Sequence, residues 1–259
     1  MTDLVGRSIA ALRTHHDALA TLANELADEQ LGCLSGASEW TIAQVLSHLG
    51  SQSEIMLAPL TAAVDGTDIP APDNQSVWDR WDAWTPREQA DGFIEHDARY
   101  LAVVEGLSAQ QRASLRIDLG FMPEPVPLSI AVGMRLNEVS QHAWDVQVAV
   151  DPNAEVDEAS AAAMVEHFAG GLSFLLGFIA KPDRLDGPAK VAIGEHTLIV
   201  DDAVSIRPSA EGATATFAGP AGAVLRLVGG RLSPEHTPAG VDVTGSVSLE
   251  DLRAVFPGY

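Results

Sequence analysis

The pattern of apolar residues changes at Lys181-Pro182, and this change restricts the chain to a fold in two parts. Before it, apolar residues recur every three to four positions, as they do on one face of an amphipathic helix. After it, apolar and polar residues alternate in short runs between glycine, proline and aspartate, a pattern typical of strands and turns. We therefore predict an α+β protein, with a helical domain over residues 1–182 and a small α+β domain over residues 183–259.

The helical half has two clear helix starts. Thr41 with Gln44 forms a capping box, and Trp40 lies just before it, in the position of a hydrophobic staple. Thr85 is followed by a proline and by Glu88 at the third helical position, which is a second strong start. The apolar periodicity predicts helices over 4–26, from 41 onward, and over 85–106, 129–150 and 157–179.

The second half is predicted to form an antiparallel sheet. Its alternating segments are VAIG, TLIV, AVSIRP, TATF, AVLRLV and VDVTG, and SLEDLRAVF near the C-terminus predicts a short helix. No residues in this half have the spacing of a catalytic site. We expect the small domain either to form part of the substrate site or only to stabilise the fold.

Acidic residues outnumber basic ones by 36 to 15, which gives a net charge of −21. Such a charge repels the phosphate backbone of nucleic acids, so we expect no nucleic-acid partner. No stretch reaches the roughly 18 consecutive apolar residues of a membrane span, and the N-terminus does not resemble a secretion signal. We therefore expect a cytoplasmic monomer or homodimer that does not bind membranes.

Cys33 is the only cysteine in the chain. An intramolecular disulfide and a zinc site made of several thiolates are therefore excluded. A single cysteine is more often a small buried apolar residue than a nucleophile. If the protein uses thiol chemistry, we expect the thiol to come from a cosubstrate.

Three residues are well placed to bind a metal ion. Glu138 and His142 are four positions apart in a predicted helix, so their side chains leave the same face one turn apart. His48 lies at a similar edge of the helix that begins at Thr41, and it can join the pair if the two helices are neighbours. Two imidazoles and one carboxylate suit Zn²⁺ or a similar divalent ion, and three protein ligands leave an open position, as in catalytic sites.

The spacing alone does not decide between this metal site and a simpler interpretation. A histidine at the edge of a helix is usually a boundary residue with a hydrogen-bond partner. A glutamate four positions before a histidine is common, and the pair often makes only a weak side-chain contact. The more specific HExxH and paired CxxC motifs are absent from the sequence.

Three segments resemble those of the mycothiol-dependent maleylpyruvate isomerase family. SEWTIAQVLSHLG is similar to the family's GWTV.DVLAHL segment, and RLNEVSQHAWDVQVAV to its R..E...HAWDLA segment. VTGSVSLEDLRAVFPGY resembles the end of the small C-terminal domain that often follows. The order and separation of the three also match, although Glu39 stands where the family usually has glycine.

This resemblance implies a DinB-like four-helix bundle, followed by the small domain, with one metal ion held by His48, Glu138 and His142. It also implies mycothiol as a cosubstrate, in actinobacterial cytoplasm. Zn²⁺ is the ion that the donor set favours. Coordination deprotonates a thiol, and the metal-bound thiolate would attack an electrophilic carbon of a small second substrate.

The site is compatible with more than one reaction. Loss of the thiol after bond rotation gives cis–trans isomerisation, whereas retention of the thiol makes the enzyme an S-transferase. Two other interpretations stay open. One is a non-catalytic protein of the same fold that binds a small ligand, and the other is a metal-dependent hydrolase whose open position holds hydroxide.

Three further residues are candidates for the site. Asp145, three positions after His142, either orients a ligand or is a solvated helix residue. Arg80 in WDRWDAW either binds an anionic group of the substrate or is a surface arginine stacked on a nearby tryptophan. Arg135, three positions before Glu138, is a second candidate for the anion, or pairs with an acid of the protein.

Overall fold

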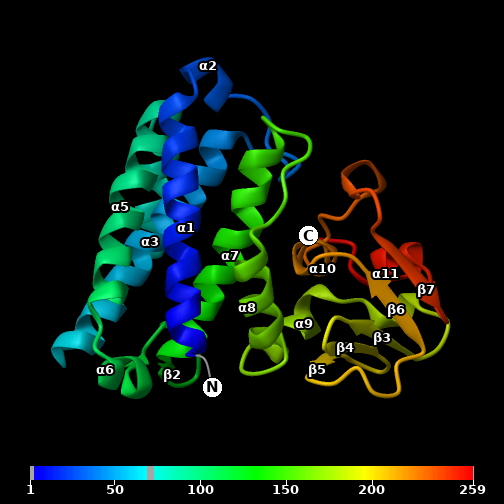
Figure 1. The fold of residues 1–259 in the computed structure, drawn as a ribbon. Helices are drawn as coiled ribbons and strands as arrows, with labels where there is room; N and C mark the ends of the chain where they lie inside the picture. Colours follow the sequence, from blue (N-terminus) through cyan, green and yellow to red (C-terminus); the bar gives the residue numbers. More distant parts are fainter. Residues whose placement is uncertain (1–2, 69–72, 259) are drawn as a thin grey trace. The chain divides into compact units, whose positions relative to one another are not determined.

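The computed structural model describes residues 3–68 and 73–258 and divides into two units, Met1–Asp151 and Pro152–Tyr259. The first unit is a bundle of four long helices (Figure 1). These helices are α1 (Leu4–Glu25), α3 (Ile42–Asp65), α5 (Pro86–Gly106) and α7 (Leu128–Val148). α1 and α3 each pack against both α5 and α7, so the predicted four-helix bundle is confirmed.

Short elements connect the long helices. They are α2 (Asp28–Leu31), α4 (Asn74–Asp82), α6 (Ala109–Ser114) and the antiparallel strands β1 (Arg116–Ile117) and β2 (Val126–Pro127). The two strands lie within the proline-containing segment that joins α6 to α7. This segment carries the chain from one long helix to the start of the last one.

Local capping signals determine where α3 and α5 begin, as predicted. The Thr41 hydroxyl accepts the Gln44 N–H at 3.2 Å, and the Gln44 side chain accepts the Thr41 N–H at 2.8 Å. Thr85 and Glu88 form the same reciprocal pair at the start of α5. Because an N-terminal cap of this kind sets the first residue of a helix, it also sets the direction in which each later side chain leaves it.

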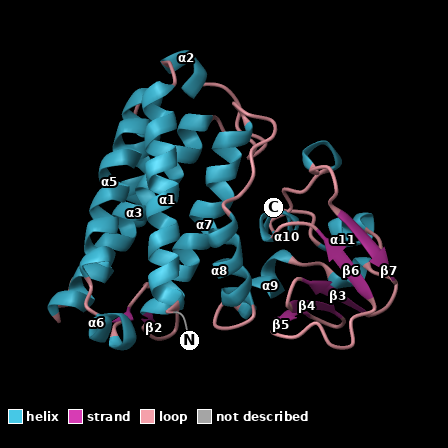
Figure 2. Cartoon of the chain, in the orientation of Figure 1, coloured by secondary structure: helices cyan, strands magenta, loops and turns pink. Residues whose placement is uncertain are grey.

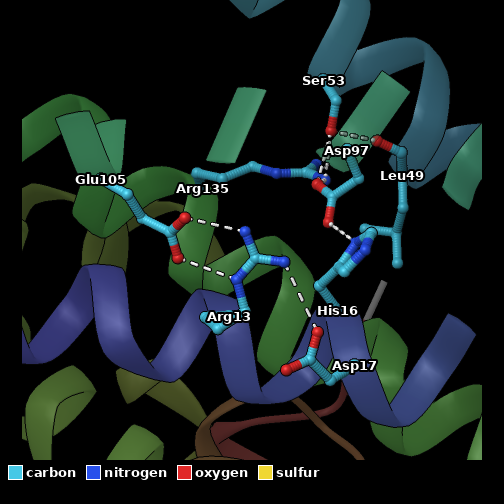
Figure 3. A network of polar contacts seen from close by, with 8 residues as sticks. All are labelled: Arg13, His16, Asp17, Leu49, Ser53, Asp97, Glu105 and Arg135. Atoms are coloured by element: carbon cyan, nitrogen blue, oxygen red, sulfur yellow. Dashed lines mark hydrogen bonds and ion pairs between the residues drawn. The ribbon is translucent and has the colours of Figure 1, made fainter. Parts of the chain in front are cut away.

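A buried polar cluster joins all four helices of the bundle (Figure 3). Arg135 of α7 is fully buried, and its guanidinium donates to Asp97 Oδ1 of α5 and to Ser53 Oγ of α3, both at 2.7 Å. His16 of α1 lies with its Nδ1 at 2.9 Å from Asp97 Oδ2. Burial alone would raise the pKa of Asp97, but the charge of Arg135 and these hydrogen bonds lower it to about 2.

The second unit combines a five-stranded sheet with short helices (Figure 2). The strand order is β5-β4-β3-β6-β7. The strands are β3 (Ala189–Ile193), β4 (His196–Val200), β5 (Val204–Arg207), β6 (Ala215–Ala218) and β7 (Asp242–Gly245). The helices are α8 (Glu158–Phe168), α9 (Ser173–Ile179), α10 (Ala221–Val228) and α11 (Leu249–Val255), with single 3₁₀ turns at Pro182–Arg184 and Pro234–His236.

Two predictions for the sheet are wrong. The sheet is mixed, because β3 and β6 run parallel while the other neighbouring pairs run antiparallel. Alternation of apolar and polar residues identifies the two faces of a strand and not its direction. The segment AVLRLV forms part of α10 instead of a strand, and every residue from Gly222 to Val228 is buried. A helix buried on all sides has no polar face that would reveal its period.

The chain divides into units earlier than the boundary predicted between residues 182 and 183. α8 packs against α10, and α9 packs against β5, so both helices belong to the second unit. The helix predicted over 157–179 is in fact two helices, α8 and α9. Gly170 and Gly171 lie in the break between them, and the two helices meet at 94°. Among the described residues, no single helix is long and apolar enough to span a membrane, and this bent pair reaches that length only when the two helices are taken together.

Candidate metal centre

Neighbouring helices bring the three predicted metal ligands together. His48 lies on α3, and Glu138 and His142 lie one turn apart on α7, which packs against α3. His48 Nε2 is 3.1 Å from Glu138 Oε2, and His142 Nε2 is 3.8 Å from the same oxygen. The condition that sequence spacing left open, contact between the two helices, is therefore met.

The donor set fits a single divalent cation. One ligand atom from each of His48, Glu138 and His142 lies within 4.8 Å of the other two, and all three residues are partly exposed. The two imidazole rings meet edge to face with their centroids 4.9 Å apart. Two imidazole nitrogens and one carboxylate oxygen are ligands that Zn²⁺ and similar ions prefer.

Glu138 carries the negative charge of this group. Burial alone would raise the pKa of Glu138, but the hydrogen bond with His48 and the charges of His142, His48 and Arg135 outweigh it and lower the pKa below its usual value. The carboxylate is therefore ionised at neutral pH, which is the form that binds a metal ion.

Asp145 supports the His142 ring from behind. Its Oδ2 lies 2.8 Å from His142 Nδ1, and the residue has no exposed surface. With Nδ1 engaged in this way, Nε2 is the nitrogen that faces Glu138. A carboxylate in this position fixes the tautomer and the orientation of a ligating imidazole.

The two arginines considered for an anionic substrate group are each paired with an acidic residue of the protein. Arg80 forms an ion pair with Glu54, whose second oxygen accepts the Trp81 indole N–H at 2.9 Å. Glu54 follows His48 by six positions on α3, a rotation of about 240° around the helix axis, so the two residues leave different faces. Arg135 belongs to the buried cluster with Asp97 and has no exposed surface.

Trp40 is a site residue that the sequence analysis did not identify. Its ring is stacked on that of His142 at 21° with centroids 5.9 Å apart, and it is tilted against His48 at 5.2 Å. The sequence pattern predicts only a hydrophobic staple for Trp40 at the start of α3. A signal was present, since this large aromatic residue precedes the helix cap and lies about two helical turns before His48, a candidate ligand on the same helix.

A family model matches the stretch of chain that carries these residues. The sequence model of the mycothiol maleylpyruvate isomerase N-terminal domain matches residues 12–147, just over half of the chain, and this stretch contains all three candidate ligands. An uncharacterised Mycobacterium tuberculosis protein, named Rv0738 in strain H37Rv and MT0763 in strain CDC 1551, is 26% identical over 141 residues. The match covers 54% of this chain and 66% of that relative, so the chain spans just under two thirds of the relative's length.

Two solved structures share the fold across both units. The crystal structure of the mycothiol-dependent maleylpyruvate isomerase has a TM-score of 0.65 and 15% identity, over 95% of this chain and 98% of that one. A histidine-to-alanine mutant of mycothiol-dependent maleylpyruvate isomerase gives the same TM-score at 14% identity, with the same coverage. The resemblance to the family is thus confirmed, and the chain belongs to the mycothiol maleylpyruvate isomerase family.

Proposed function

We propose that this protein is a metal-dependent enzyme that uses mycothiol as an S-transferase or cis–trans isomerase on a small electrophilic substrate. The observation that carries the proposal is the convergence of His48, Glu138 and His142, whose donor atoms lie within 4.8 Å of one another. Membership of the family and the fold shared with a mycothiol-dependent maleylpyruvate isomerase support the choice of thiol.

Each residue of the site has a distinct role in this proposal. His48 and Glu138 would hold the ion from neighbouring helices, and His142 would complete the set in the orientation imposed by Asp145. A bound ion such as Zn²⁺ lowers the pKa of a thiol that it coordinates, so that the thiolate is available near neutral pH. The same residues serve isomerase and transferase alike, because the two outcomes differ only in whether the thiol leaves the product.

A hydrolase finds less support in the same geometry. Asp145 is the acidic residue beside His142 that could act as a general base, but it is buried and engaged by His142 Nδ1. A water molecule at the open position would need a base that reaches it. We therefore retain the thiol-dependent activity as the conclusion.

Metal content of the purified protein tests the site. We expect about one equivalent of a divalent metal in the wild type and its loss in His48→Ala and Glu138→Ala. His196→Ala, at a half-buried histidine of β4, is the matched control and should keep the metal. A non-catalytic binding protein without a metal site would show no difference among the four.

Product analysis then separates the possible reactions. The metal-loaded protein is incubated with mycothiol and a panel of electrophiles that includes maleylpyruvate, and products are identified by mass and retention. A mass increased by that of the thiol indicates a transferase, and an unchanged mass with altered geometry indicates an isomerase. Turnover that persists in His48→Ala would contradict the proposed function.

A further inference from the structure

Trp40 is carried by a hairpin that is closed by several hydrogen bonds. The backbone N–H and the hydroxyl of Ser35 both donate to the Trp40 carbonyl, at 2.9 and 2.8 Å. The Ile42 N–H donates to the Cys33 carbonyl at 2.9 Å, and Leu34 pairs with Thr41 as an antiparallel bridge. The hairpin passes directly into the capped start of α3, so Trp40 is held on a rigid support.

Gly36 attaches this hairpin to α7. Its N–H donates to the Asp145 carbonyl at 2.7 Å. A Cβ atom at this position would lie 2.6 Å from Val148 Cγ1 and 3.1 Å from Asp145 Cα, so a larger residue forces the two backbones apart. Asp145 thus anchors two parts of the site, the His142 ring through its side chain and the Trp40 hairpin through its backbone.

The indole covers the two imidazoles and remains partly open. Trp40 contacts the rings of His48 and His142 and is still 39% exposed. The arginines that could have selected a charged substrate are paired with Glu54 and Asp97. The side chain that the structure places against both candidate imidazole ligands is therefore a flat aromatic ring.

We propose that Trp40 is a substrate-contacting residue, and that its exposed indole binds a flat, unsaturated or aromatic group of the electrophilic substrate beside the metal. This inference rests on the proposed function, since it assumes a metal ion between His48, Glu138 and His142. Aromatic groups prefer offset-stacked or edge-to-face contact with an indole, and a saturated ring of equal size cannot match this geometry.

Two carboxylates that differ mainly in the flatness of their ring test the inference. Phenylacetate and cyclohexylacetate both carry a CH₂–COO⁻ group that is ionised at neutral pH, so they coordinate a metal similarly. Each is titrated into the Co²⁺-loaded full-length protein, and binding is followed by the change in the visible absorption of the cobalt. We expect the wild type to bind phenylacetate about three- to tenfold more tightly than cyclohexylacetate, the range that an aromatic contact supplies.

Variants assign this preference to the indole. Trp40→Ala should reduce the affinity ratio of the two carboxylates to near one without changing the affinity for Co²⁺, and Trp40→Phe should keep most of the ratio. Trp78→Ala is the matched control, because Trp78 of α4 is similarly exposed, at 44%, and should leave the ratio unchanged.

The possible failures are distinguishable. A metal-loaded wild type that binds both carboxylates equally, or a Trp40→Ala variant that keeps the preference, overturns this inference alone. Weaker Co²⁺ binding in both Trp40 variants would also overturn it, because Trp40 would then only support the ligands. A wild type that binds no metal overturns the proposed function and this inference together.

Discussion

Asp145 Oδ2 lies 2.8 Å from His142 Nδ1, on the side of the ring opposite the nitrogen that faces Glu138. We infer from this contact that Asp145 holds the His142 ring in the orientation that binds the metal. We expect Asp145→Ala to weaken metal binding by about 10- to 100-fold, the usual effect of losing a carboxylate behind a ligating imidazole. Competition with a chromophoric chelator measures the change. Asp65→Asn, at the exposed end of α3, is the control, and equal affinities in all three proteins would contradict the assigned role.

Removal of the metal should destabilise the first unit. A ligand that binds only the folded state stabilises it by about 2.7 kcal/mol when its free concentration is 100 times the Kd. We therefore expect excess EDTA to lower the melting temperature of the wild type. The same treatment should leave His48→Ala unchanged, because that variant lacks a donor from α3. An equal effect of EDTA on both proteins would show that the stabilising metal lies elsewhere.

The buried Arg135–Asp97 pair should contribute strongly to stability. Asp97→Ala leaves the Arg135 guanidinium buried without its carboxylate, and such a change costs about 3–5 kcal/mol. The free energy of unfolding in urea measures this cost. The double variant Asp97→Leu with Arg135→Met should lose less than the single one, since it removes both charges.

An exposed ion pair on the surface provides a comparison with the buried Arg135–Asp97 pair. Arg99 and Glu95 form an ion pair on α5, with side chains 57% and 60% exposed. Arg99→Ala should therefore cost less than about 1 kcal/mol. A cost for Asp97→Ala as small as this would show that water or another partner replaces the lost carboxylate.

Acid should weaken the bundle through Asp97. Its pKa is about 2 in the folded protein and about 3.9 in the unfolded chain, so the ionised carboxylate favours folding. This contribution is fully present above the unfolded pKa and is lost as the pH falls from about 4 towards 2. We expect it to amount to about 2.5 kcal/mol. Urea unfolding at pH 5 and pH 2.5 should show a smaller difference for Asp97→Asn than for the wild type.

Gly36→Val should displace Trp40 while leaving the indole itself intact. The added side chain would collide with Val148 and with the backbone of Asp145, so the hairpin must move away from α7. We expect the phenylacetate-to-cyclohexylacetate affinity ratio of the Co²⁺-loaded protein to fall as it does in Trp40→Ala, and a second change, Val148→Ala, to restore part of it. Gly106→Val is the control, because a Cβ there meets no atom within 4 Å. An unchanged ratio in Gly36→Val would mean that the hairpin does not depend on this contact.

Local sequence determined the parts of the protein whose causes lie within one or two helical turns. The reciprocal hydrogen bonds of Thr41 with Gln44 start α3 where the sequence predicts. The two residues are only three positions apart, so this interaction is local. The four-residue spacing of Glu138 and His142 likewise places both on one face of α7, whatever packs against it. The resemblance to a known family added the expectation that His48 completes this pair.

Only the tertiary structure decided what faces the site. Packing of α3 against α7 brings His48 to Glu138, and the Gly36 contact brings Trp40 over both imidazoles, across distances in sequence that no periodic pattern encodes. The partner of Arg80 could not be predicted from the sequence either, because its neighbours in the chain give no sign of its pairing with Glu54. The parallel pairing of β3 with β6 also escaped prediction. Apolar alternation records which side of an element is buried, whereas direction, neighbours and partners arise only when separate elements pack together.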